Sequence, residues 1–405
     1  MPISIAILPT FQADDYFLAV KLLFSPWNYF NRQKEVALRQ KIKEYFNGKH
    51  VFLFDSGRTS LFILLKAMGF AARDEILLQA FTCVVVPNAV RGTGATPIYV
   101  DVDDNLNLSA ADMEKKITPR SRAVIIQHSF GLPAETEEIS RICQAHNLIL
   151  IEDLAHALGN YYQGKPLGTF GKASILSFGR DKVISGICGG AILTNDENLA
   201  KEVEKIVSAL PYRSFFWVLR QLCYPLCMLI VLNTYSFFGL GKLIHFALNF
   251  LKILPRVVTR EEKRGEKSEM FYVGLPGALS ALALNQLKKL DVFTAHRKKI
   301  AQVYASSLKS TFNGDCSYLR YNIFVDEPRA LREFAAKRNI FLGDWYNKVV
   351  APKDVELDKV DYVAGSCPQA ENSCRKIVNL PTNPNMGLDE ARRVVETVNL
   401  WKLKK

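Results

Sequence analysis

The sequence of 405 residues predicts an α/β protein in which a large domain, built on a doubly wound and mainly parallel sheet, precedes a small C-terminal α+β domain. From about Phe52 to Asp196, short apolar runs alternate with stretches of helical period, which is typical of repeated βαβ units. After Pro276 the pattern becomes helical and then mixed. An unusually apolar stretch between these parts predicts a hydrophobic helical insertion at residues 208–269.

The composition limits the class of protein. Hydrophobic residues make up 49% of the chain and charged residues 23%, which is enough for a core and excludes long disorder. The length predicts two to three domains or one two-lobed enzyme, and it argues against a bare binding module. The net charge of +12 favours anionic partners, namely phosphorylated metabolites, nucleic acid or an acidic membrane surface.

The cysteines and the N-terminus indicate a reducing compartment. Eight cysteines are scattered without a C-x-x-C pair, so neither a metal site nor a dense disulfide framework is expected. Residues 1–17 show no basic start followed by an apolar run and a cleavage site, so no secretory signal is visible. The basic residues are spread out and match no nucleic-acid-binding motif. We therefore expect a cytoplasmic catalytic body without a nucleic-acid partner.

The elements of the large domain follow one another as VFLF, SLFILLKAMG, EILLQAF, TPIYVDV, AVIIQHSFG, ISRICQAH, LILIEDLA, ASILSF and GGAILTND. The runs at 123–127 and 148–151 are apolar on both faces, as expected of strands that helices cover on each side. In such a sheet, ligand groups come from the carboxyl ends of the strands and the loops beyond them. Polar residues at those ends are therefore candidates for a functional site.

The C-terminal part is predicted to begin with helix at residues 278–308, where leucines and alanines recur at three- and four-residue spacing. Two strands, YNIFVD and IVNL, lie around the helix EPRALREFAAKRN, and LDEARRVVETVNLWKLKK closes the chain as an amphipathic helix. The predicted divisions are an N-terminal helical segment (1–50), the large domain (51–207), the insertion (208–269), and a connecting helix with the small domain (270–405).

Three segments at strand ends could carry chemistry: residues 55–60, 152–156 and 177–182. Each alone has an ordinary structural interpretation, as a helix N-cap, a surface carboxylate or a solvated lysine. Together they supply a glycine loop at a helix N-terminus for a phosphate, a carboxylate for a heteroaromatic nitrogen and a lysine for a carbonyl. Pyridoxal 5′-phosphate requires all three groups, because it needs a Schiff-base lysine and an anionic partner for its ring nitrogen.

These segments resemble the DegT/StrS family of fold-type-I, pyridoxal-phosphate-dependent sugar aminotransferases. The resemblance extends through DEILLQAFTCVVVPNAV, GATPIYVDVDDNLNLSAADMEKKITPRSRAVI, HSFG, LILIEDLAHALGNYYQGKPLGTFGKASILSF and GGAILTND. It resumes in ALSALALNQLKKLD and in CPQAENSCRKIVNLPTNPN near the end. The resemblance therefore covers most of the chain and implies the fold-type-I architecture.

The resemblance assigns roles to individual residues. Lys182 corresponds to the lysine that forms the Schiff base, Asp153 to the carboxylate facing the ring nitrogen, and His156 to the residue beside the ring oxygen. The corresponding phosphate ligands are Ser177, Gly57, Arg58 and Thr59.

The resemblance also implies the reaction. Glutamate, as amino donor, would displace Lys182 from the cofactor, and the freed amine would move the proton between donor and cofactor. A keto sugar, nucleotide- or lipid-linked, would then take the amino group, in the biosynthesis of a surface polysaccharide or glycan. Relatives that dehydrate sugars carry histidine in place of the lysine, so Lys182 argues against the alternative of a dehydratase. The other alternative is a catalytically silent, membrane-associated sensor or scaffold. The family usually forms homodimers, and we expect one here.

The sequence departs from the family pattern near the expected site. Cys83 stands where an aromatic residue commonly stacks on the cofactor ring, and sulfur covers less of the ring. Residues 270–275 correspond to the family's Gly-Tyr-Asn-Tyr-Arg-Met stretch, which reaches into the partner's site, but lack its Asn and Arg. Arg58 replaces the usual Thr, so Arg58 or Arg180 is expected to supply positive charge near the phosphate or substrate. Arg180 and Tyr346 are the candidate substrate contacts.

The insertion contains an apolar span of membrane-crossing length. Residues 221–241 include no charged side chain, and a bilayer-spanning helix needs about 20 residues. Four residues within the span argue against one straight spanning helix because proline and glycine interrupt helices. These residues are Pro225, Asn233, Gly239 and Gly241.

The next stretch, residues 242–254, predicts a helix with a narrow polar stripe. The stripe consists of Lys242, His245, Asn249 and Lys252. Such a wide apolar face must be covered, either by protein or by lipid. We predict monotopic contact with the cytoplasmic face of a membrane through residues 214–254, followed by a basic cluster at anionic head groups. Burial in a dimer interface or a packed subdomain is the alternative.

Overall fold

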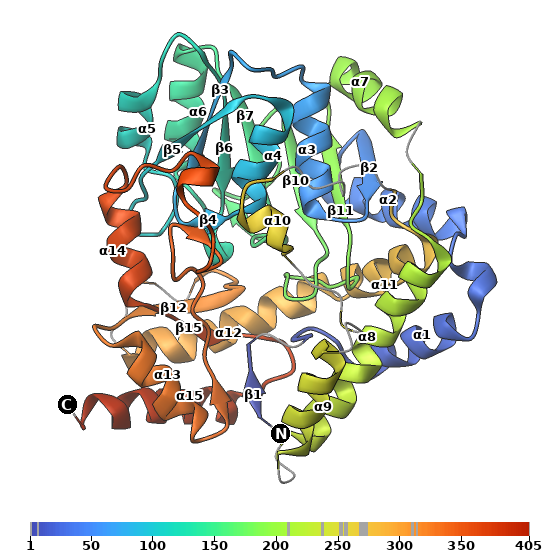
Figure 1. Cartoon of the computed structure of the whole chain (residues 1–405), viewed down its shortest axis with the longest axis vertical. Coiled ribbons are helices and arrows are strands. Elements are labelled where there is room, and N and C mark those ends of the chain that lie inside the picture. Colours follow the sequence, from blue (N-terminus) through green and yellow to red (C-terminus); the bar gives the residue numbers. More distant parts are fainter. Residues whose placement is uncertain are drawn as a thin grey trace.

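The computed structural model describes residues 2–5, 8–208, 211–235, 239–250, 254, 258–266, 274–308, 312 and 315–404. A seven-stranded sheet forms its centre (Figure 1). In spatial order the strands are β2 (His50–Phe54), β11 (Gly190–Thr194), β10 (Ala173–Ser177), β7 (Ile149–Asp153), β6 (Ser121–Gln127), β3 (Glu75–Gln79) and β5 (Thr96–Val100). Only β11 runs antiparallel to its neighbours, so the predicted doubly wound, mainly parallel sheet is confirmed.

Helices cover both faces of this sheet because the strands carry apolar side chains on both faces. Ile76 and Leu78 of β3 join one core cluster, whereas Leu77 joins another on the opposite face. The first face is covered by α3 (Gly57–Ala67), α4 (Val85–Thr93) and α7 (Glu197–Val207). The second is covered by α5 (Ala110–Lys116) and α6 (Thr136–Ala145). The N-terminal helices α1 (Ala13–Leu23) and α2 (Arg32–Phe46) extend a third cluster beside β2 and β11.

The predicted helix at 278–308 consists of two helices, α11 (Gly277–Leu287) and α12 (Leu290–Leu308). In the small unit beyond them, β12 (Arg320–Phe324) pairs with β15 (Ile377–Pro381). These are the two strands predicted as YNIFVD and IVNL. Its helices are α13 (Pro328–Ala336), α14 (Pro368–Lys376) and α15 (Leu388–Lys402).

Short strand pairs tie the distant parts of the chain together. The N-terminal β1 (Ile3–Ser4) pairs with β13 (Ile340–Phe341), and β4 (Thr82–Cys83) pairs with β14 (Val350–Ala351). The hairpin of β8 (Tyr161–Tyr162) and β9 (Lys165–Pro166) follows β7. The 3₁₀ turns are η1 (Pro26–Asn28), η2 (Ser129–Gly131) and η3 (Asp358–Val360). The small unit is thereby held against the carboxyl ends of the central strands.

The insertion folds as α8 (Phe215–Thr234), α9 (Leu240–Phe250) and the short α10 (Arg260–Lys263). The span 221–241 is not one straight helix, as expected, because α8 ends at Thr234 and α9 begins at Leu240. Pro225 and Asn233 nevertheless lie inside α8. A proline inside a helix costs about 3 kcal/mol. Burial of one face of α8 against the third core cluster offsets this cost. The buried residues of that face include Val218, Leu222, Met228 and Val231.

Helix α8 is long and apolar enough to cross a membrane, judged by length and composition alone. About two fifths of its most apolar window, 39%, is buried within the protein. The helix lies away from the central sheet and packs beside α1 and α9 (Figure 1).

Candidate functional site

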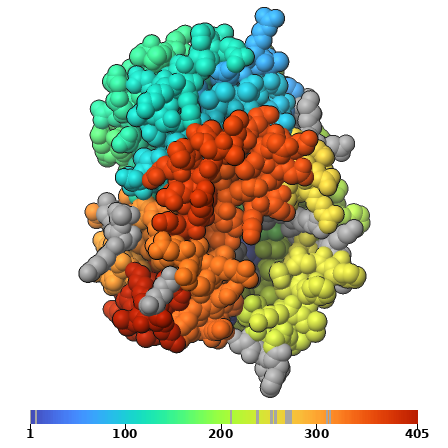
Figure 2. Space-filling model, turned by 60° about the vertical axis from the view of Figure 1, so that its left-hand side comes forward, coloured from blue at the N-terminus to red at the C-terminus, as the bar shows by residue number. Residues whose placement is uncertain are grey.

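A cavity of about 490 Å³ lies where the carboxyl ends of β7 and β10 meet the N-terminus of α3. The small C-terminal unit closes one side of it through Arg320, Trp345 and Tyr346. The insertion closes another side through Trp217 and Gln221 of α8. Figure 2 shows the hollow between the orange C-terminal segment and the yellow-green insertion. The cavity therefore lies at the strand ends where the sequence predicts ligand groups.

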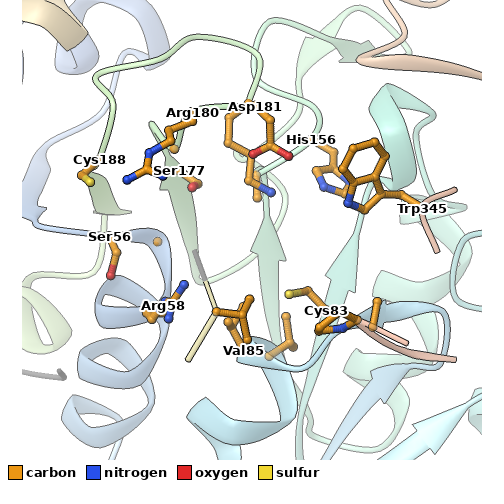
Figure 3. A pocket seen from close by; sticks show the side chains of 18 of the residues that line it. Ser56, Arg58, Cys83, Val85, His156, Ser177, Arg180, Asp181, Cys188 and Trp345 are labelled. Carbon is orange, nitrogen blue, oxygen red and sulfur yellow. The ribbon is translucent and has the colours of Figure 1, made fainter. Parts of the chain in front are cut away.

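One end of the cavity is suited to an anion. Helix α3 begins at Gly57, and the N-cap Ser56 accepts a hydrogen bond from the backbone N–H of Thr59 at 3.2 Å. A Cβ atom at Gly57 would lie 2.9 Å from Cβ of Ser177, so only glycine lets β10 approach the helix start this closely. Side chains of Ser56, Arg58, Ser177 and Arg180 gather at this end (Figure 3). Backbone N–H groups and positive charge together favour a phosphate there.

Thr59 does not line this cavity. Its side chain is fully buried, and its hydroxyl donates a hydrogen bond to Oδ1 of Asp55 at 2.7 Å. Oδ2 of the same carboxylate accepts from Arg213 at 2.7 Å. Thr59 therefore fixes the loop before α3 rather than offering its hydroxyl to a ligand.

A buried carboxylate lies on the floor of the cavity. Asp153 ends β7, and its Oδ1 accepts from the backbone N–H of Ala155 at 2.9 Å. Its Oδ2 accepts from the Gln127 amide at 3.2 Å, and the Thr82 hydroxyl orients that amide from 2.5 Å. Burial raises the pKa of Asp153, while the Ala155 N–H, Lys182 and Gln127 act in the opposite direction. A cationic ligand group would supply the missing stabilisation of its charge.

Lys182 lines the same cavity from the loop that follows β10. Two buried side chains hold this loop. Arg297 of α12 donates to the carbonyl of Val183 at 3.0 Å, and Gln286 of α11 accepts from the N–H of Ser185 at 3.2 Å. The helices of the C-terminal half thereby fix the backbone that carries the lysine.

His156 forms part of an aromatic wall. Its ring stacks on Phe130, with 5.1 Å between centroids and 11° between planes. Its Nε2 lies 3.4 Å from the hydroxyl of Tyr346, which the sequence singled out as a substrate contact. Burial, together with the charges of Lys182 and Arg320, holds the pKa of His156 well below its ordinary value. The imidazole is therefore neutral near pH 7.

The neutral state of His156 predicts a pH-dependent stability. In the unfolded chain His156 binds a proton near pH 6.5, whereas in the folded chain it does so only at lower pH. The free energy of unfolding therefore falls as the pH drops below 6.5. Between pH 7.5 and 5.5 we expect this residue to account for a loss of about 1.4 kcal/mol. Urea unfolding of the wild type and of His156→Gln at both pH values measures the difference. An equal loss in the two proteins would show that His156 does not titrate in this way.

Helix α8 of the insertion holds Arg180 in place. The guanidinium lies 3.9 Å from the ring centroid of Tyr224, and its Nη2 donates to Oε1 of Gln221 at 3.3 Å. Gln221 also accepts from the thiol of Cys188 at 3.3 Å. Sequence patterns could not assign these α8 residues to the site, because they lie in an apolar stretch without a motif. The insertion is therefore part of the cavity wall.

The three departures from the family pattern have different outcomes. Arg58 pairs with the buried carboxylate of Glu262 in α10, so much of its charge is balanced within the protein. Cys83 lines the cavity, and burial raises the pKa of its thiol. Of the stretch 270–275, only Gly274 and Leu275 are described, so the expected partner-subunit contact lies outside the described residues.

The cavity thus brings together nine of the ten predicted site residues, all except Thr59. Its chemistry is that of an anion-binding end, a buried carboxylate and a lysine amine in one enclosed space. Within the described ranges, no group of three His, Cys, Asp or Glu side chains could hold a metal ion. Two residues that sequence reasoning missed, Gln127 and Arg320, also line it.

Comparison with known proteins identifies relatives over the whole chain. The model of the DegT/DnrJ/EryC1/StrS aminotransferase family matches residues 19–210 and 260–399. The spore coat polysaccharide biosynthesis protein SpsC of Bacillus subtilis (strain 168) is 27% identical over 408 residues, covering 96% of this chain and 95% of SpsC. The unmatched residues 211–259 lie within the predicted insertion.

Solved structures share the fold. Helicobacter pylori PseC, an aminotransferase involved in the biosynthesis of pseudoaminic acid, superposes with a TM-score of 0.76 at 22% identity, covering 98% of both chains. Bacillus subtilis NtdA, solved with bound cofactor PMP, superposes with a TM-score of 0.73 at 20% identity, covering 96% of this chain and 82% of NtdA. These likenesses confirm the predicted fold class.

Proposed function

The chain belongs to the DegT/DnrJ/EryC1/StrS aminotransferase family, and from this membership we propose that it moves an amino group from glutamate to a keto sugar with pyridoxal 5′-phosphate as cofactor. One observation carries the proposal. Asp153, Lys182 and the N-terminus of α3 face a single cavity of about 490 Å³. No simpler ligand would require this carboxylate, this amine and this anion-binding end together.

The residues present fit this cofactor. The helix start at Gly57 leaves room for a phosphate where any larger residue would meet Ser177. Asp153 has the buried carboxylate with which a protonated ring nitrogen would pair. This pairing would lower the pKa of Asp153, which burial raises. When bound, the cofactor supplies an aldehyde for amine exchange and a ring that withdraws electrons from the bond being broken.

The side chains of the cavity then have separate roles in binding the cofactor and in transferring the proton. Ser56, Ser177 and the first N–H groups of α3 would bind the phosphate, and Arg180 would add positive charge beside it. Asp153 would keep the ring nitrogen protonated. The amine of Lys182 would carry a proton to and from the α-carbon of the amino donor.

We propose Arg320 as the group that binds the donor carboxylate. The side chain lines the cavity, stacks 3.8 Å from the ring centroid of Trp345 and donates through Nη2 to Asp181 at 2.8 Å. Its Nε is buried and makes no hydrogen bond within the part of the chain that the structure describes. A buried guanidinium with a free N–H is suited to a carboxylate.

We further propose that the acceptor is a keto sugar carried by a nucleotide or a lipid, and that the product enters a surface polysaccharide or glycan. The name of the relative SpsC, a spore coat polysaccharide biosynthesis protein, supports this direction. We also propose a homodimer, as the family resemblance implies. Light scattering of the purified protein should then give twice the chain mass of 45.7 kDa.

An absorbance spectrum tests the proposal. After reconstitution with pyridoxal phosphate, we expect a visible band that glutamate replaces with one at shorter wavelength, together with one 2-oxoglutarate per active site. Glutarate, which has both carboxylates but no amine, is the control and should leave the band unchanged. The absence of a chromophore would favour the scaffold alternative. A keto sugar that loses water without gaining nitrogen would favour the dehydratase alternative.

A further inference from the structure

Helix α9 presents its apolar side to solvent. Gly241 is buried, and the partly buried Ile244 and Leu248 pack toward the third core cluster. The side chains on the outer face are instead large and exposed, with exposed fractions of 64% for Leu243, 68% for Phe246 and 76% for Phe250. A surface helix of a soluble protein normally turns its polar side outward. This outer face of α9 therefore requires a cover.

The outer side of α8 is apolar as well. Phe216 and Ile230 are exposed by 76% and 54%, and the half-buried Cys223 and Cys227 lie between them at helical spacing. Helices α8 and α9 pack side by side at the edge of the molecule (Figure 1). We call the outward side chains of these two helices the apolar face. The yellow-green segment that carries it borders the hollow in Figure 2.

The stretch of sequence that carries the apolar face has charges of one sign. Residues 205–260 contain no aspartate or glutamate. Two of its basic residues are balanced within the protein, Lys205 by Glu202 and Arg213 by Asp55. The stretch has five further basic residues: Arg220, Lys242, Lys252, Arg256 and Arg260. In a twofold dimer the same patch faces itself, so these charges would meet like charges. An anionic lipid surface would instead attract them by about 1 kcal/mol for each basic side chain near it.

We propose that the apolar face docks on the surface of an anionic lipid bilayer, with Phe246 and Phe250 inserted at the level of the head groups. The helix α8 lies on the bilayer and does not cross it. Its inner side is committed to the protein, because Gln221 and Tyr224 hold Arg180 and because Val218 and Leu222 are buried. A spanning arrangement would separate these residues from the cavity.

Flotation with lipid vesicles tests this proposal on the full-length protein. We expect binding to vesicles of phosphatidylcholine with about a third phosphatidylglycerol, and much weaker binding to phosphatidylcholine alone. The double variant Phe246→Asp, Phe250→Asp should lower the bound fraction at least tenfold, because two apolar anchors become charged. Lys242→Glu should weaken only the binding to anionic vesicles, by about fivefold or more. Val363→Asp, at a residue exposed by 70% in the small unit, is the matched control and should bind as the wild type does.

The outcomes show whether a lipid surface or a second protein chain covers the apolar face. A wild-type protein that fails to float with anionic vesicles overturns the proposal, as does a double variant that floats equally well. If the double variant instead halves the mass measured by light scattering, a second copy of the chain covers the face. Vesicle binding requires neither cofactor nor turnover, so its result is independent of the aminotransferase proposal. Circular dichroism of each variant shows whether it is folded.

Discussion

Replacing Lys182 with alanine should lower the rate of the glutamate-dependent step by at least about a thousandfold. The amine of Lys182 lines the cavity and can carry a proton at the α-carbon of the donor once the donor amine has replaced it. Arg297 and Gln286 fix the loop that carries it, whereas Lys353, the other lysine that lines the cavity, comes from the small unit after β14. Single-turnover absorbance of the reconstituted protein with glutamate measures the rate.

The control for this substitution is Lys165→Ala, which removes an exposed lysine of β9 and should leave the rate unchanged. Added methylamine should restore part of the rate of Lys182→Ala, because a free amine can enter the space left by the side chain. A Lys182→Ala protein with more than about a tenth of the wild-type rate would contradict the proton-carrying role.

The sequence was sufficient to predict the parallel sheet because the buried strands are short apolar runs with polar residues at their ends. The reversed direction of β11 could not be predicted, since GGAILT has the same apolar character as the parallel strands. The continuation of α8 through Pro225 depends on packing as well. The local cost of Pro225 is set by sequence, but the burial of Val218 and Met228 that offsets it depends on tertiary packing.

The candidate site was predictable where its residues lie at strand ends. Asp153, Lys182 and Ser177 each follow a strand in a recognisable local pattern, and Gln127 at the end of β6 could have been found by the same rule. Gln221 and Tyr224 could not, because only the folded insertion brings them to Arg180. The burial of Thr59 is likewise a property of the folded loop, in which Asp55 accepts its hydroxyl.

Replacing Asp153 with asparagine should lower the rate of the same step by about 10² to 10³-fold. Asparagine keeps the shape and the hydrogen bond from the Ala155 N–H, but it carries no negative charge. Its Nδ2 donates, so the Gln127 amide must turn over to accept from it and to donate to the Thr82 hydroxyl. Without that charge the ring nitrogen of the cofactor loses its proton near neutral pH, and the ring withdraws electrons less strongly. Because burial raises the pKa of the Asp153 carboxyl, removing its charge should not lower the stability of the cofactor-free protein.

This pairing of results separates an electronic role of Asp153 from a structural one. A structural role predicts a lower unfolding midpoint and weaker cofactor binding, whereas an electronic role predicts a normal midpoint with a slow step. The control Asp389→Asn removes an exposed carboxylate that accepts from Arg392, and it should change neither quantity. The spectrum of the bound cofactor against pH is the deciding readout, because the pKa of the ring nitrogen should fall in Asp153→Asn and stay unchanged in the control. An unchanged ring pKa with a slow step would mean that Asp153 acts by position rather than by charge.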